Sequence, residues 1–126
     1  MSFQITVHTK TKIFHELKSE WNDLLKESIV DSIFLTWEWI YSWWKIYGKN
    51  YRLYIITVRD CKKRLVGIAP LKMNKRKSSI LFDLTTIEFI GCGEEVTPEY
   101  LSFIIKRGYE QKITQEIFKY IFKKNR

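Results

Sequence analysis

The stretch FLTWEWIYSWW, residues 34–44, holds four of the five tryptophans of this 126-residue chain. Thr36 is a favourable N-cap, and Glu38 places a negative charge in the first turn, where the helix dipole favours an anion. Gly48 is a residue type that commonly ends helices. We therefore predict a helix between Thr36 and Gly48, and its side chains constrain how the rest of the chain is arranged.

Apolar residues cover two faces of this predicted helix. One stripe consists of Trp37, Ile40, Tyr41, Trp44 and Tyr47, and a second of Trp39, Trp43 and Ile46. Successive helical residues are about 100° apart, so the two stripes face different neighbours. A helix that is apolar on two sides is covered on two sides. We expect a sheet on one side and, on the other, polypeptide from outside residues 1–126.

The residues before this helix predict a strand and a first helix. In segment 2–8, SFQITVH, apolar and polar residues alternate with the period of a half-buried strand. A helix then starts near Thr9 or Thr11 and runs to about Ser28, because one apolar stripe recurs at helical spacing. That stripe consists of Ile13, Leu17, Trp21, Leu24 and Leu25.

Extended segments dominate the second half of the chain. Segments 51–60 and 64–73 flank a polar turn and are rich in strand-forming residues, so they predict an antiparallel hairpin. Pro70 has no N–H to donate, which places its strand at a sheet edge or splays it locally. Segments 85–91 and 99–105 predict two further strands.

A last helix is expected after Gly108, where apolar residues again recur at helical spacing. They are Ile113, Ile117, Tyr120 and Ile121. The element order is therefore β-α-α-β-β-β-β-α. A chain of this length forms one domain, and we expect an α/β fold with a mixed, largely antiparallel sheet flanked by helices.

Composition limits the class of protein and its compartment. Hydrophobic residues make up 45% of the chain, enough for a packed core, but no apolar run approaches the roughly 20 residues of a membrane span. The N-terminus lacks a signal pattern, so we expect a cytoplasmic protein. Cys61 and Cys92 need no disulfide, and neither they nor His8 and His15 have metal-ligand spacing.

A net charge of +8 raises the question of nucleic-acid binding. The basic residues gather in the turns DCKKR and MNKRKSS and at the C-terminus. Solvated connections normally carry such residues, so this distribution favours the structural interpretation over a phosphate-binding face.

Five segments, in order, carry a family resemblance. They are WxxLL (21–25), FLTWEWIYSWW (34–44), RLVGIAPL (64–71), IEFIG (87–91) and YLSFI (100–104). Together they resemble the first half of GNAT-type N-acyltransferases, closest to the cellulose- or exopolysaccharide-biosynthesis (CelD-like) group, which is related to the Fem-type aminoacyl transferases. Such proteins resemble two GNAT-like halves in tandem. The resemblance implies that residues 1–126 form a single GNAT-like domain, the N-terminal half, and it alone suggests polysaccharide biosynthesis.

The same resemblance allows the cofactor-binding loop of the family to be compared with the corresponding residues of this sequence. GNAT domains grip the pyrophosphate of coenzyme A with a Q/R-x-x-G-x-G/A loop after the fourth strand. The matching place, FIGCGEEVTPEYLSF, has Gly91 and Gly93 but no Arg or Gln at the required offset. Glu94 and Glu95 follow and would repel a pyrophosphate. We expect this half to bind no cofactor and to be inactive alone, with acetyl-CoA or another acyl-CoA implied for the complete enzyme.

Four residues are candidates for an acceptor groove or an interface, and no catalytic residue is assigned. Glu38, Trp39 and Trp43 lie on the Trp-rich helix, and the second stripe is the better candidate because the first suffices to cover the sheet. Tyr100 follows Pro98 at a strand entrance, where its hydroxyl can donate a proton or anchor a ligand. The alternative is structural, because buried aromatics at helical spacing are ordinarily core residues.

The function expected from these observations is that of a GNAT-like half supplying an acceptor-side wall or docking surface for acyl transfer. Its partner is the missing C-terminal half, or a second copy that associates through an exposed apolar face. The alternative is a stand-alone basic and aromatic module for nucleic acids or anionic polymers, which we do not favour. A small acetyltransferase with an unusual site is a third hypothesis.

Overall fold

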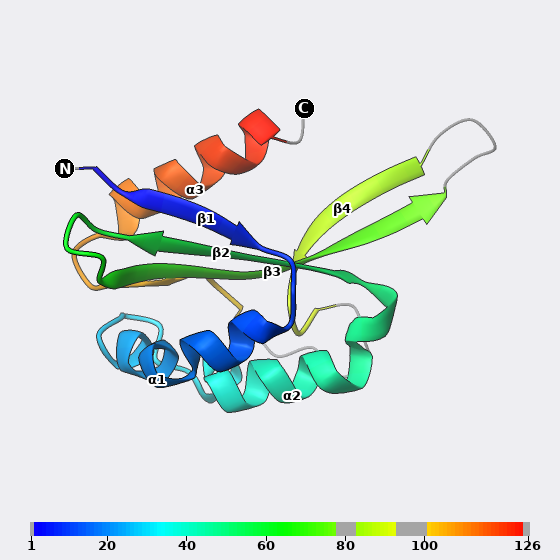
Figure 1. Ribbon diagram of the computed structural model, residues 1–126, viewed down its shortest axis with the longest axis horizontal. Coiled ribbons are helices and arrows are strands. Elements are labelled where there is room, and N and C mark those ends of the chain that lie inside the picture. The colour runs from blue at the N-terminus through cyan, green and yellow to red at the C-terminus, as the bar shows by residue number, and fades with distance from the viewer. Residues whose placement is uncertain (1, 78–82, 93–100, 125–126) are drawn as a thin grey trace.

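The computed structural model describes residues 2–77, 83–92 and 101–124 (Figure 1). The strands are β1 (Gln4–His8), β2 (Arg52–Arg59), β3 (Leu65–Lys77), β4 (Asp83–Phe89) and β5 (Ile104–Ile105). The helices are α1 (Lys12–Lys26), α2 (Trp37–Tyr47) and α3 (Glu110–Lys124), and the short 3-10 helices η1 (Ile33–Leu35) and η2 (Gly48–Asn50) flank α2. The predicted element order is confirmed, and the chain has a mixed α/β fold with an open antiparallel sheet.

The sheet has the strand order β1-β2-β3-β4, and each neighbouring pair is antiparallel. β5 also pairs with β3 in the antiparallel sense, through Gly67 and Ile68. β4 pairs with β3 farther along, from Leu71 to Lys77. Because β4 and β5 are both antiparallel to β3, they run in the same direction and occupy successive stretches of one edge of β3.

Pro70 lies at the point along β3 where the neighbouring strand on that edge changes from β5 to β4. The prediction that its strand is a sheet edge is wrong, because β3 lies between β2 and β4. The alternative, local splaying, stays a prediction. The carbonyl of Pro70 accepts a hydrogen bond from Ile90 N at 2.9 Å, and in a strand the N and C=O of one residue point to the same side. The nitrogen of Pro70 therefore faces the gap between β5 and β4, where no ladder bond is lost.

Helices cover both faces of the sheet (Figure 1). α1 and α2 pack on one face, against Leu53 and Ile55 of β2 and Ile68 of β3. α3 packs on the other face, where Ile113 and Ile117 are fully buried. Successive side chains of β2 point to opposite faces of the sheet and pack in the two cores in turn. This strand is therefore buried along nearly its whole length.

The first helix follows its sequence pattern closely. Every residue of its predicted stripe is buried. Thr11 precedes the helix but its side chain makes no capping hydrogen bond, whereas the Oγ1 of Thr36 accepts one from Trp39 N at the start of α2. At the other end of α2, a Cβ on Gly48 would stand 2.5 Å from the ring of Trp44, so any larger residue there would displace that ring.

The tryptophans of α2 are mostly core residues of this chain. Trp37 and Trp43 are 6% and 4% exposed, and the indole N–H of Trp37 donates to Phe14 O at 2.6 Å. Trp39 is half-buried, whereas Ile46 is 66% exposed. The second stripe is therefore not one uncovered face: the chain itself buries Trp43, and only its last member faces solvent.

Candidate functional site

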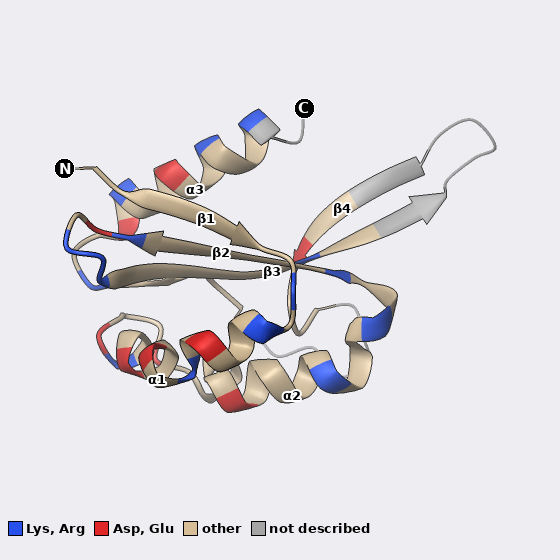
Figure 2. Cartoon of the chain, viewed as in Figure 1, with Lys and Arg blue, Asp and Glu red and all other residues tan. Residues whose placement is uncertain are grey.

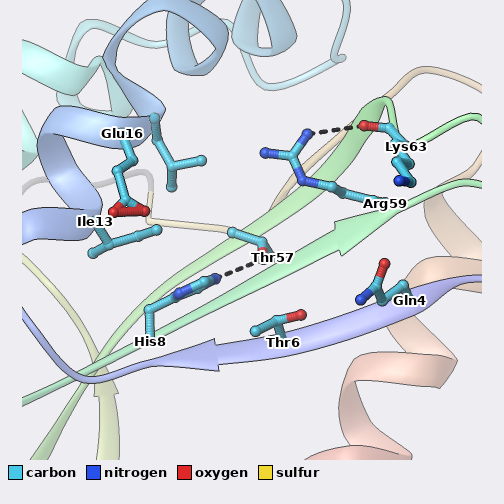
Figure 3. A pocket seen from close by; sticks show the side chains of 9 residues that line it. Gln4, Thr6, His8, Ile13, Glu16, Thr57, Arg59 and Lys63 are labelled. Atoms are coloured by element: carbon cyan, nitrogen blue, oxygen red, sulfur yellow. Dashed lines mark hydrogen bonds between the residues drawn. The ribbon is translucent and has the colours of Figure 1, made fainter.

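A polar cavity of about 580 Å³ lies between α1 and the strands β1 and β2 (Figure 3). Its polar lining comprises Gln4, Thr6 and His8 of β1, Thr57 and Arg59 of β2, and Glu16 of α1. The register of the sheet places these residues together. Gln4 is paired with Arg59 and Thr6 with Thr57, so their side chains share one face. Ile5 and Val7 point to the opposite face, where they pack in the core beneath α3.

Histidine is the residue type in this cavity whose ordinary pKa lies nearest to pH 7, which draws attention to His8. Its Nε2 lies 2.9 Å from Thr57 Oγ1. Burial lowers the pKa of His8 below its ordinary value of 6.5; the Arg59 charge lowers the pKa further, and Glu16 opposes both. The imidazole is therefore neutral near pH 7. When Nε2–H donates to Thr57, Nδ1 keeps a lone pair that can accept a proton.

Arg59 is held at the other end of the cavity by an ion pair. Its two terminal nitrogens donate to the two carboxylate oxygens of Glu20 at 2.9 and 3.0 Å, and one of them also donates to Lys63 O at 3.0 Å. The hydrogen bond from Arg59 lowers the pKa of Glu20, and the same bond raises the pKa of Arg59. The positive charge of Arg59 is therefore fixed in place and partly balanced.

Asp60 organises the turn after β2 at this end of the cavity by hydrogen bonds. Asp60 Oδ1 accepts hydrogen bonds from Lys62 N and Arg64 N, each at 2.9 Å, and Arg64 Nε donates to Oδ2. These bonds, with the backbone of Arg64 contributing most, lower the pKa of Asp60. Lys63 adopts a left-handed backbone with φ of 65° in this turn, and it lines the cavity.

The cavity therefore has two unlike ends. The Glu16 carboxylate extends from α1 on the side of the cavity where His8 lies, and Arg59 and Lys63 lie at the far side (Figure 3). A carboxylate attracts an ammonium group, and a neutral imidazole can take a proton from it. The arrangement suits a small molecule that carries a primary amine.

A second polar centre is buried beneath the C-terminal part of α2. Lys72 of β3 is fully buried, and its Nζ lies 4.8 Å from the ring of Trp43 and 4.6 Å from that of Tyr51. Nζ donates to the carbonyls of Phe89 and Cys92 and lies 3.5 Å from Glu88 Oε1. Lys72 thus holds the chain segment that leaves β4.

That segment is the place where the sequence has its G-x-G pattern. Gly91 has φ of +111°, a backbone conformation that favours glycine, and the ring of Trp39 lies 3.2 Å from where its Cβ would stand. The carbonyls of Phe89 and Cys92 turn inward to Lys72. Gly93 lies outside the described residues.

Three of the residues singled out from the sequence, Glu38, Trp39 and Trp43, do not line the polar cavity. Glu38 is exposed and accepts a hydrogen bond from Asn22 Nδ2 at 2.9 Å, which lowers its pKa. Trp39 packs edge-on against Phe34 at 5.4 Å. Trp43 lies over Lys72, and Tyr100 falls outside the described residues. The structure places Trp39 next to Gly91 and Trp43 next to Lys72, but it does not bring Glu38 to either contact.

Sequence reasoning missed the residues of the polar cavity. One signal was present, because Gln4, Thr6 and His8 alternate with apolar residues and so had to share the polar face of a strand. Their partners Glu16 and Arg59 come from other elements, and only the packing of α1 on the sheet brings them together.

Comparisons of this chain with known protein families, with curated proteins and with solved structures find no significant match. Among residues 2–77, 83–92 and 101–124, no three His, Cys, Asp or Glu side chains are grouped so that they could hold a metal ion. Within the same ranges, no helix combines the length and the apolar character needed to cross a membrane.

Proposed function

We propose that this chain is the acceptor-side half of a GNAT-type N-acyltransferase and that the polar cavity binds the amino group of the acceptor. The first four segments that resemble the family fall in α1, in η1 and α2, in β3 and at the end of β4, and the described part of the fifth, residues 101–104, leads into β5. The element order and the antiparallel sheet also agree with the expectation from that resemblance. Only the amino group of the acceptor is inferred from the cavity. The link to polysaccharide biosynthesis rests on the resemblance alone.

One observation carries the proposal: His8 and Glu16 face one cavity. An amine attacks a thioester only after it has lost a proton. Glu16 would hold the ammonium form, and the neutral imidazole of His8 would accept the proton, leaving the nitrogen lone pair free to attack. The carboxylate then stabilises the imidazolium that forms.

The acyl-CoA is assigned to a partner half because the residues after β4 do not fit its pyrophosphate. A phosphate cradle presents backbone N–H groups, but here two carbonyls at the start of the segment are bound to Lys72. The sequence that follows supplies Glu94 and Glu95 and no arginine or glutamine at the required offset.

Amine binding can be tested by NMR on the isotope-labelled chain. We expect ethylammonium to shift the amide signals of β1 and of the first turns of α1, and propionate, of similar size, to leave them unchanged. The Glu16→Gln variant should bind the amine about fivefold more weakly, because one charge is lost. Glu27→Gln, the same change beyond the end of α1, is the matched control.

Two results would count against the proposal. If the wild type and Glu16→Gln bind ethylammonium equally well, Glu16 does not hold the ammonium group and the polar cavity is not the amine site. Micromolar binding of acetyl-CoA to this chain alone, measured by isothermal titration, would show that the acyl donor does not need a partner half.

A further inference from the structure

Helix α3 has a second apolar face that points to solvent. Ile113 and Ile117 cover the sheet, whereas Phe118 and Phe122 are 45% and 65% exposed. The two exposed rings stack with centroids 6.0 Å apart and planes 18° apart. Large exposed aromatic side chains that lie next to one another commonly mark an interaction surface.

These rings end a row of aromatic contacts that starts in the sheet. Phe89 of β4 contacts Phe103 at 5.6 Å between centroids, and Phe103 contacts Phe118 at 5.7 Å. A groove of about 390 Å³ runs beside β5; these three phenylalanines and Val30 line it, together with one acidic residue, Glu110. It adjoins the open face of α3 on which Phe118 and Phe122 lie. Because both share Phe118, they form one continuous surface, which we call the aromatic groove.

Positive charge borders the exposed end of the aromatic groove. Lys119 and Lys123 lie on the same open face of α3 as the two phenylalanines, and Figure 2 shows both basic and acidic residues along α3, with Lys near its C-terminal end. The whole chain has a net charge of +8. A second copy would bring the same lysines and the same net charge to the contact, which disfavours self-association through this face.

We propose that the aromatic groove binds an amphipathic helix of another polypeptide whose apolar stripe is bordered by Asp and Glu. The apolar stripe would lie on the phenylalanines, and the acidic border would face Lys119 and Lys123. α3 has 15 residues and is therefore about 22 Å long, enough for about four turns of a partner helix.

The shape of the surface favours a helix over a lipid bilayer. Phe89 and Phe103 line the groove and are half-buried, whereas Phe118 and Phe122 are exposed, so the surface is more enclosed at the phenylalanines on the sheet side than on α3. A recess accepts projecting side chains, whereas a flat bilayer reaches only the outermost rings. The groove lies at the β5 edge of the sheet and the polar cavity at the β1 edge, so the inference stands whether or not the cavity binds an amine.

The test uses two labelled synthetic peptides and fluorescence anisotropy. Both are helical with the same leucine stripe, one bordered by glutamate and the other by lysine. We expect the full chain to bind the glutamate peptide at least about tenfold more tightly than the lysine peptide. The double variant Phe118→Ser, Phe122→Ser should lose at least about tenfold in affinity, and Lys119→Glu with Lys123→Glu should reverse the preference.

Ile46→Ser is the matched control, because Ile46 is as exposed as Phe122 but lies on α2. It should leave binding unchanged, and circular dichroism should show every variant folded. The proposal is overturned if neither peptide binds, if the phenylalanine variant binds as the wild type does, or if sedimentation shows the chain pairing with itself through this face. It is also overturned if only anionic vesicles or an oligonucleotide bind there.

Discussion

Lys72 shows how strongly one residue depends on its surroundings. A buried ammonium group costs several kcal/mol unless hydrogen bonds and charges compensate for its lost hydration. Here two carbonyls, the Glu88 carboxylate and the rings of Trp43 and Tyr51 surround it. Lys72 thus ties the segment after β4 to the sheet, in addition to the backbone hydrogen bond from Ile90 N to Pro70 O.

Replacing Lys72 with methionine should therefore be strongly destabilising. Methionine keeps much of the volume but leaves two carbonyls and the Glu88 carboxylate without the ammonium group. We expect the free energy of unfolding in urea to fall by about 3 kcal/mol. Lys62→Met, the same change at an exposed turn residue, should alter it by less than about 0.5 kcal/mol. Similar losses in both variants would show that Lys72 is not a special position.

The sequence could not have revealed either polar site in full. A single lysine in a strand is ordinarily exposed, so nothing in RLVGIAPLKM marks Lys72 as buried; its burial follows from the position of Trp43 and of the segment after β4. Likewise, the polar face of β1 can be read from its alternation. That Glu16 and Arg59 face His8 depends on the packing of α1 and on the register of β2.

At the scale of elements, the helices were predictable because their periodicity is a property of their own residues. The bounds of the strands were less predictable, because the strands with which they pair determine where they end. β3 extends to Lys77, beyond the predicted end at residue 73, because β4 pairs with it there. Pro70 lies inside the sheet because β4 and β5 divide the edge of β3 between them.

Helix capping offers a matched pair of substitutions. Thr36 caps α2 by accepting from Trp39 N and also donates to Ile33 O at 2.7 Å, whereas Thr11 makes no such cap on α1. Thr36→Ala should lower the free energy of unfolding by about 1 kcal/mol, and Thr11→Ala by clearly less. Chemical denaturation measures both, and a larger loss from Thr11→Ala would contradict the assignment of the caps.

For the whole molecule, the sheet separates two surfaces of different character. The polar cavity lies at the β1 edge under α1, and the aromatic groove lies at the β5 edge beside α3. Lys and Arg occur on the turn after β2, on α2 and on α3 (Figure 2). Positive charge is therefore spread over several elements, which gives the nucleic-acid alternative no particular support.

Because the two surfaces share no residue, they should act independently. Substitutions at distant sites without shared partners usually have additive effects. The Phe118→Ser, Phe122→Ser variant should bind ethylammonium as the wild type does, and Glu16→Gln should bind the glutamate peptide unchanged. NMR and anisotropy titrations on the same samples measure both. A change of more than about threefold in either cross-test would indicate that the two surfaces are coupled.

The acceptor-side proposal depends above all on the protonation state of His8, which an NMR pH titration of its ring measures. Burial and Arg59 lower its pKa while Glu16 raises it, so the folded chain should titrate below 6.5, and Glu16→Gln should lower the pKa further. The neutral form then prevails at pH 7 and can accept a proton. A His8 pKa above 7, or one that Glu16→Gln leaves unchanged, would contradict the proposed role of this pair.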